Sequence, residues 1–101
     1  MIYRLSLRRA AVDDMAEAEA YYAAESEGLD LHFRNEVARV LQRIEANPAI
    51  YPVSEKTPYR KATLRIFPFC IYYCVMKEKV VVIAVHHAKR RAGRWKRRAK
   101  P

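Results

Sequence analysis

The sequence predicts a single α+β domain spanning residues 1–101, in which two helices cover one face of a sheet of about four antiparallel strands. Three observations predict this class. The N-terminus alternates polar and apolar residues, two segments with helical apolar spacing come next, and three β-rich runs with short turns follow them. The chain has the length of one domain, and 51% hydrophobic residues are enough to build a core.

The first two elements are a strand and a helix. Residues 2–7 alternate with period two, which is typical of a strand. From Arg9 to about Glu25 the chain is rich in Ala, Glu and Asp, which favours a helix. Four of its residues fall near one face of that helix: Val12, Met15, Glu19 and Tyr22. Gly28 is well placed to end the helix at its C-terminus.

A second helix is predicted from about Asp30 to Ala46. Its apolar stripe consists of Leu29, Phe33, Val37, Val40, Leu41 and Ile44. Asn47-Pro48 ends this helix, because the residue before a proline is disfavoured in helical geometry. The break between the two helices is short, so they should form an antiparallel hairpin.

Three strands then form an antiparallel meander. Residues 61–67 alternate charged and apolar side chains, as expected of a half-exposed strand. Phe69–Met76 is apolar on both faces and should be a covered central strand, followed by a tight turn at residues 76–79. Val80–Val85 is a β-branched run typical of another interior strand.

The charge is strongly segregated along the chain. Residues 1–58 hold seven Lys or Arg against ten Asp or Glu, a net charge of −3. Residues 59–101 hold thirteen Lys or Arg against Glu78 alone, a net charge of +12. Such a field indicates a polyanionic partner, either nucleic acid or an acidic protein surface.

The chain ends in a basic segment, residues 89–100, with eight Lys or Arg and no acidic residue. Cations of this kind contact phosphates, and Trp95 offers a face for base stacking. The alternative is a solvated tail with Trp95 folded back on the sheet edge, and residues 96–101 are the part most expected to be a disordered extension. The predicted target-binding residues are Arg60, Lys61, Arg65, Lys89, Arg90, Arg91, Arg94, Trp95 and Arg98.

Two adjacent histidines, His86 and His87, close the last strand and should point to opposite faces. His87 is the candidate general acid or base of an RNA cleavage reaction, with Arg90 stabilising charge on the phosphate. The more ordinary interpretation is a hydrogen-bonding structural histidine.

The remaining patterns narrow the function classes. Metal-ligand spacing and a glycine-rich phosphate loop are missing, so no metal or cofactor is expected. Cys70 and Cys74, about 13 Å apart along a strand, are expected to be buried free thiols. The chain contains no apolar run of about 18 residues and starts without an apolar signal segment, so we expect a cytoplasmic protein that does not span a membrane.

Four stretches together make the chain resemble the RelE/ParE toxins of type II toxin–antitoxin modules over nearly its full length. They are Ala11-x-x-Asp14 with Tyr21-Tyr22; Phe33-x-x-Glu36-Val37 with Ile44-x-x-Asn47-Pro48 and Tyr51-Pro52; Arg60-x-x-x-Leu64-x-x-Phe67-Pro68-Phe69-x-Ile71-x-Tyr73; and Val80-x-Val82-x-x-Val85-x-His87-x-x-Arg90 with Trp95 and Arg98.

The resemblance implies a growth-inhibiting toxin that is neutralised by a cognate acidic antitoxin. RelE-like members cleave mRNA in the ribosomal A site, whereas ParE-like members inhibit DNA gyrase and cleave nothing. Here Trp95 stands where the ribonucleases are expected to have a tyrosine, and Ala92 replaces a proline of one variant of the family. We therefore favour the ParE-like function, with the RelE-like ribonuclease as alternative. A third alternative is a degenerate member that keeps only antitoxin and operator binding.

Overall fold

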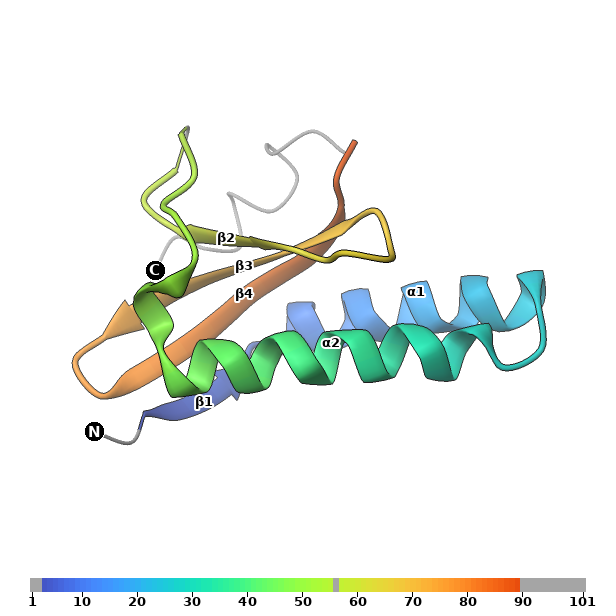
Figure 1. The fold of residues 1–101 in the computed structure, drawn as a ribbon, viewed down its shortest axis with the longest axis horizontal. Helices are drawn as coiled ribbons and strands as arrows, with labels where there is room; N and C mark the ends of the chain where they lie inside the picture. Colours follow the sequence, from blue (N-terminus) through green and yellow to red (C-terminus); the bar gives the residue numbers. More distant parts are fainter. Residues whose placement is uncertain (1–2, 56, 90–101) are drawn as a thin grey trace.

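The computed structural model, which describes residues 3–55 and 57–89, confirms the predicted order of a strand, a helical hairpin and a three-stranded meander. In chain order the elements are β1 (Arg4–Leu7), α1 (Arg9–Glu25), α2 (Leu29–Ala46), the 3-10 helix η1 (Pro48–Ile50), β2 (Arg60–Thr63), β3 (Phe69–Met76) and β4 (Lys79–His87). The strands form one sheet in the order β1-β4-β3-β2. Figure 1 shows both helices along one face of this sheet, as their apolar positions predict.

The first strand runs parallel to its neighbour, which corrects the expectation of a fully antiparallel sheet. β1 pairs in parallel with β4, whereas the β2–β3 and β3–β4 pairs are antiparallel. The helical hairpin returns the chain to the end of the sheet where β1 begins, so β2 runs in the same direction as β1 (Figure 1). Because the meander then reverses twice, β4 has that direction too and lies parallel to β1.

The strand predicted over residues 61–67 is shorter in the structure, since β2 ends at Thr63. The Leu64 N–H donates to the Phe69 carbonyl at 2.9 Å, and the Phe69 N–H donates to the Phe67 carbonyl at 2.8 Å. These bonds fold the chain into a tight reversal, and Pro68 has no N–H for a strand ladder. The connection between β2 and β3 is therefore a compact loop, which we call the 64–68 loop.

Gly28 starts the second helix and does not end the first, contrary to the prediction. α1 ends at Glu25, and the Ser26 N–H caps it by donating to the Tyr22 carbonyl at 3.1 Å. Gly28 then precedes α2 with φ = +84°, in the left-handed region that glycine adopts without steric penalty. The three residues 26–28 thus reverse the chain between two long helices, closed by the Leu29 N–H, which donates to the Ser26 carbonyl at 3.1 Å.

The main core lies between the helices and the sheet. α2 contributes Phe33, Val37, Val40 and Ile44, as its stripe predicts. The buried residues of α1 are two small ones, Ala11 and Ala18. Val12, which was predicted to lie on the apolar face, is instead 46% exposed. The buried Tyr73 hydroxyl donates to the Pro48 carbonyl at 2.6 Å, which attaches η1 to the central strand.

A second, smaller cluster lies on the sheet face away from the helices. Cys70, Tyr72, Ile83 and Ala84 form it, with Cys74 packed beside them. Both cysteines are free: Cys70 is buried and Cys74 is half-buried, where burial raises the pKa of its thiol despite the opposing charge of Arg8. In the part of the chain that the structure describes, no helix is long and apolar enough to cross a membrane.

Candidate functional site

A β-bulge sets the direction of His87 at the end of β4. Tyr72 pairs with Ala84 and Tyr73 pairs with Val82, so Ile83 is one extra residue in β4. Simple alternation from Val80 and Val82 would have pointed His86 toward the helices. The bulge shifts the alternation by one residue and turns Val85 and His87 toward that side instead.

His87 is held by its own backbone turn and by an aromatic neighbour. The Lys89 N–H donates to the His87 Nδ1 at 3.2 Å, and the ring lies edge-on to Phe69 with centroids 5.4 Å apart. The Ala88 N–H donates to the Pro68 carbonyl at 2.8 Å, so the end of β4 is tied to the 64–68 loop. A neutral imidazole that accepts at Nδ1 carries its proton on Nε2. In this arrangement the Nδ1 lone pair of His87 is engaged by the Lys89 N–H.

Asp14 of α1 joins the helix to the part of β4 that lies beyond the end of β1. Its Oδ2 accepts the Val85 N–H at 3.0 Å and lies 3.4 Å from the Nε2 of the buried His86. β1 pairs with β4 only as far as Val82. Beyond that point the edge of β4 lies beside α1, whose Asp14 accepts the Val85 N–H. The two histidines thus differ in surroundings: His86 adjoins a carboxylate, and His87 is half-buried against Phe69.

A cavity of about 330 Å³ opens beside His87, between α1 and the ends of β3 and β4. Its lining residues are Asp14, Glu17, Ala18, Tyr21, Tyr22, Pro68, Phe69, Val85 and His87. Two of them are carboxylates, and among the described residues no lysine or arginine lines it. This cavity, which we call the His87 pocket, is acidic and aromatic in a protein with net charge +9.

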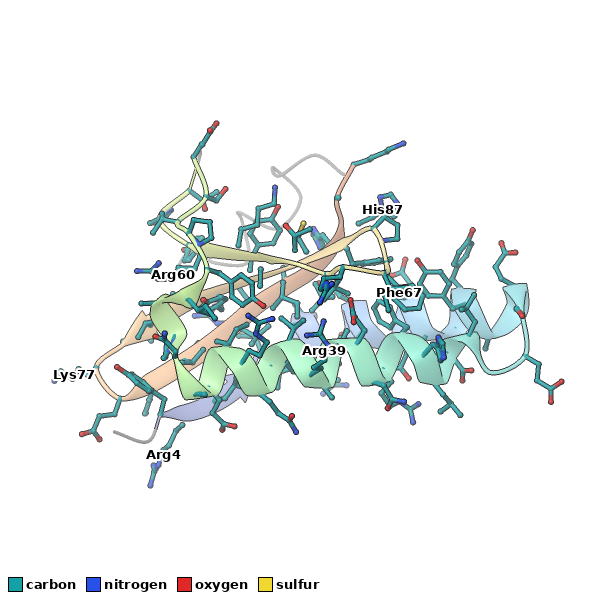
Figure 2. The ribbon with its side chains drawn as sticks, in the orientation of Figure 1. Arg4, Arg39, Arg60, Phe67, Lys77 and His87 are labelled. Atoms are coloured by element: carbon teal, nitrogen blue, oxygen red, sulfur yellow. The ribbon has the colours of Figure 1, made fainter. Side chains whose placement is uncertain are left out.

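Arg65 lies in the 64–68 loop, which the buried carboxylate of Glu36 clamps to α2. One Glu36 oxygen accepts the backbone N–H groups of Arg65 and Ile66 at 2.7 and 3.0 Å. The other oxygen accepts from Arg39 Nη2 at 3.0 Å. Burial alone would raise the pKa of Glu36, but the two amides and Arg39 outweigh it and hold the pKa below its ordinary value. In Figure 2, Arg39 projects from α2 toward this loop.

Arg60 and Lys61 are neighbours in β2, so their side chains leave opposite faces of the sheet. Arg60 Nη1 donates to the Tyr51 carbonyl at 2.6 Å, which fastens the segment after η1 to the sheet. Lys61 is half-buried, and its N–H donates to the Pro52 carbonyl at 3.0 Å. Arg60 therefore already has a structural partner, whereas the side chains of Arg65 and Lys89 extend from the surface, exposed to solvent.

The structure divides the predicted site residues between the two ends of the sheet. Arg60 pairs with Tyr73 and Tyr73 with Val82, five residues before His87, which is about 16 Å along the strand. Figure 2 shows Arg60 and His87 toward opposite ends. Arg65 and Lys89 lie at the His87 end, since Phe69 pairs with His87 directly after the 64–68 loop. The remaining predicted residues lie outside the described part of the chain: Arg90, Arg91, Arg94, Trp95 and Arg98.

Comparison with known proteins gives a family and a fold. Residues 5–92 match the family model described as the ParE toxin of the type II toxin–antitoxin system parDE. No curated protein matches the sequence. A solved structure described as the chromosomal ParDE TA system from P. aeruginosa has the same fold, with a TM-score of 0.73. The two chains are 19% identical over 85% of this chain and 96% of that one.

Proposed function

Because the chain belongs to the ParE toxin family of type II toxin–antitoxin systems, we propose that it arrests bacterial growth by inhibiting DNA gyrase and does not cleave RNA. The toxin role follows from the family, and an antitoxin is its expected partner. The choice of gyrase as target rests on the residues around His87. The protein would act in the cytoplasm, where gyrase and the antitoxin are found.

The surroundings of His87 are the observation that carries this proposal. An RNA cleavage site needs a free base and cations around the phosphate. In this protein the His87 Nδ1 accepts a hydrogen bond from the Lys89 N–H, and two carboxylates, Asp14 and Glu17, line the pocket beside it. Two carboxylates repel a phosphate where a nuclease would need to attract it.

The other candidate cations support the same conclusion. Arg60, at the far end of the sheet, donates to the Tyr51 carbonyl and is too distant to share a site with His87. Trp95 replaces the tyrosine of the ribonucleases, and an indole has no hydroxyl for proton transfer. We therefore assign contact with gyrase to the basic segment, which begins at Lys89, two residues after the end of β4. An acidic antitoxin would neutralise the same charge.

The change His87→Gln is expected to leave growth inhibition unchanged within about twofold, because glutamine keeps a polar, hydrogen-bonding side chain at this half-buried position and no proton transfer is lost. A nuclease that uses His87 as its base would lose about 10²–10⁴-fold in rate. Growth after induced expression measures the effect, with protein level and melting temperature as controls. Loss of growth inhibition by a folded His87→Gln protein would contradict the proposal.

The state of the nucleic acids in induced cells separates gyrase inhibition from the alternatives. We expect a reporter plasmid to lose negative supercoils while transcripts stay uncut at ribosomal A sites. A RelE-like toxin would give cut transcripts and a normally supercoiled plasmid. Unimpaired growth on induction would identify the degenerate member and reject the toxin activity.

A further inference from the structure

Four aromatic rings form a continuous wall of the His87 pocket. The ring centroids of Tyr21 and Tyr22 lie 5.3 Å apart, those of Tyr22 and Phe69 lie 6.1 Å apart, and those of Phe69 and His87 lie 5.4 Å apart. Tyr21 is 60% exposed, so the outer end of the wall is open to solvent. Large aromatic faces exposed beside a cavity favour a flat or cationic side chain.

Carboxylates surround the open end of this wall. Glu17 and Asp14 line the pocket itself, one and two turns of α1 before Tyr21. Glu25, the last residue of α1, accepts a hydrogen bond from Tyr21, and this bond raises the pKa of the Tyr21 phenol. The mouth of the pocket is thus negatively charged and aromatic at the same time.

We propose that the His87 pocket receives an arginine side chain of the antitoxin. A guanidinium lies flat on aromatic rings and also bonds carboxylates in a bidentate manner, so it uses both parts of the lining. A lysine ammonium uses the charge but not the planar stacking, and a nucleic-acid phosphate is repelled. The inference rests on the family membership that implies an antitoxin, and it does not depend on gyrase being the target.

The charge distribution makes such a contact specific. The acidic residues of an antitoxin would be attracted to any of the cations on this basic chain. That attraction gives affinity, but it does not fix the position of the antitoxin on the toxin surface. One arginine directed into the acidic His87 pocket fixes where the antitoxin lies on α1 and β4. Elsewhere the basic toxin attracts acidic residues of the antitoxin, but this acidic pocket attracts a basic one. A partner that lacks the arginine therefore leaves the pocket unfilled and binds less well.

The test uses the full chain and the tripeptide acetyl-Gly-Arg-Gly-amide, with its citrulline counterpart as the neutral probe of the same shape. In a nuclear magnetic resonance titration, we expect only the arginine peptide to shift the backbone amides of Val85 and His87. Glu17→Gln and Tyr21→Ala are each expected to weaken its binding about fivefold. Glu45→Gln, the same charge change on an exposed face of α2, should leave binding unchanged.

Four results of these titrations would overturn the proposal. Equal shifts with citrulline, or none with arginine, would show that the pocket does not recognise a guanidinium. Equal effects of Glu17→Gln and Glu45→Gln would show only general charge attraction. Tighter peptide binding after Arg90→Ala and Arg91→Ala would make the chain's own basic segment the occupant.

The antitoxin itself provides the last comparison. The cognate antitoxin, co-expressed from the neighbouring reading frame, is expected to abolish the peptide-induced shifts of Val85 and His87 in the complex. Unchanged peptide binding in the complex would place the antitoxin elsewhere and overturn the inference. Because neither titration involves gyrase, failure of this inference and failure of the proposed target are distinguishable.

Discussion

Glu36→Ala is expected to lower the free energy of unfolding by about 3 kcal/mol. The buried carboxylate accepts the N–H groups of Arg65 and Ile66 and bonds Arg39. Alanine leaves both amides of the 64–68 loop and the Arg39 guanidinium without this acceptor. The side chains that flank them, Leu64 and Phe67, are buried in the core, so the loop cannot swing out to water without exposing apolar surface.

Urea unfolding of the two proteins measures this effect. Glu45→Ala is the matched control, because Glu45 lies exposed near the end of the same helix. Its free energy of unfolding should change by no more than about 0.5 kcal/mol. Equal stability of the Glu36→Ala and Glu45→Ala proteins would show that the clamp contributes nothing.

The same carboxylate gives stability a pH dependence of known sign. The pKa of Glu36 is lower in the folded protein than its ordinary value of 4.5. Its contribution to stability is therefore complete above that ordinary pKa and is lost as the pH falls through the lower, folded value. Glu36→Gln should be less stable at neutral pH, and the difference from wild type should shrink in acid. A difference that grows in acid would contradict the assignment.

Replacing Arg90, Arg91 and Arg94 together by alanine is expected to reduce inhibition of gyrase roughly hundredfold. These residues are three of the eight cations of the basic segment, and they follow closely after the strand that carries His87. The core and the Glu36 clamp are built from other residues, so the free energy of unfolding should stay within about 0.5 kcal/mol of wild type.

The matched control removes three exposed charges outside the basic segment, through Arg4→Ala, Arg9→Ala and Lys79→Ala. Arg4 pairs with Lys79 at the start of β4, and Arg9, the first residue of α1, makes an i,i+4 contact with Asp13. We expect this control to inhibit gyrase within about threefold of wild type, since remote exposed charges act only through the screened general field. If both triple variants lost activity equally, net charge and not the basic segment would determine inhibition.

Much of the fold follows from local patterns in the sequence. The stripe of α2 predicts the buried residues Phe33, Val37 and Val40 directly, because helical spacing and burial coincide there. α1 is harder to interpret, since its buried positions Ala11 and Ala18 are no more apolar than the alanines around them. Ala11 and Ala18 are buried in place of Val12 because of how α1 packs against the sheet, which only the tertiary structure determines.

Features that depend on distant segments could not be predicted from the sequence. The early end of β2 depends on Glu36, about thirty residues earlier, which takes the amides of Arg65 and Ile66. The bulge at Ile83 has no marker in a run of β-branched residues, yet it decides that His87, and not His86, lines the pocket. The parallel pairing of β1 with β4 follows from the number of chain reversals and not from the composition of either strand.

The candidate site was predicted only in part for the same reason. The position of His87 at the end of the last strand was predictable, but its carboxylate neighbours were not. Asp14 lies 71 residues before Val85, whose N–H it accepts, and acidic residues early in a helix have a sufficient local explanation in the helix dipole. The clustering of Asp14, Tyr21, Phe69 and His87 appears only when α1 is packed against the ends of β3 and β4.

The most direct test of the proposed function applies one preparation of the purified protein to two reactions. The first is supercoiling of relaxed plasmid by DNA gyrase, and the second is cleavage of mRNA positioned in the A site of a translating ribosome. The proposal predicts loss of supercoiling at a few-fold excess of toxin over gyrase and uncut mRNA at the same concentration. Supercoiling that continues unaffected at stoichiometric excess, together with A-site cleavage that His87→Gln abolishes, would contradict it.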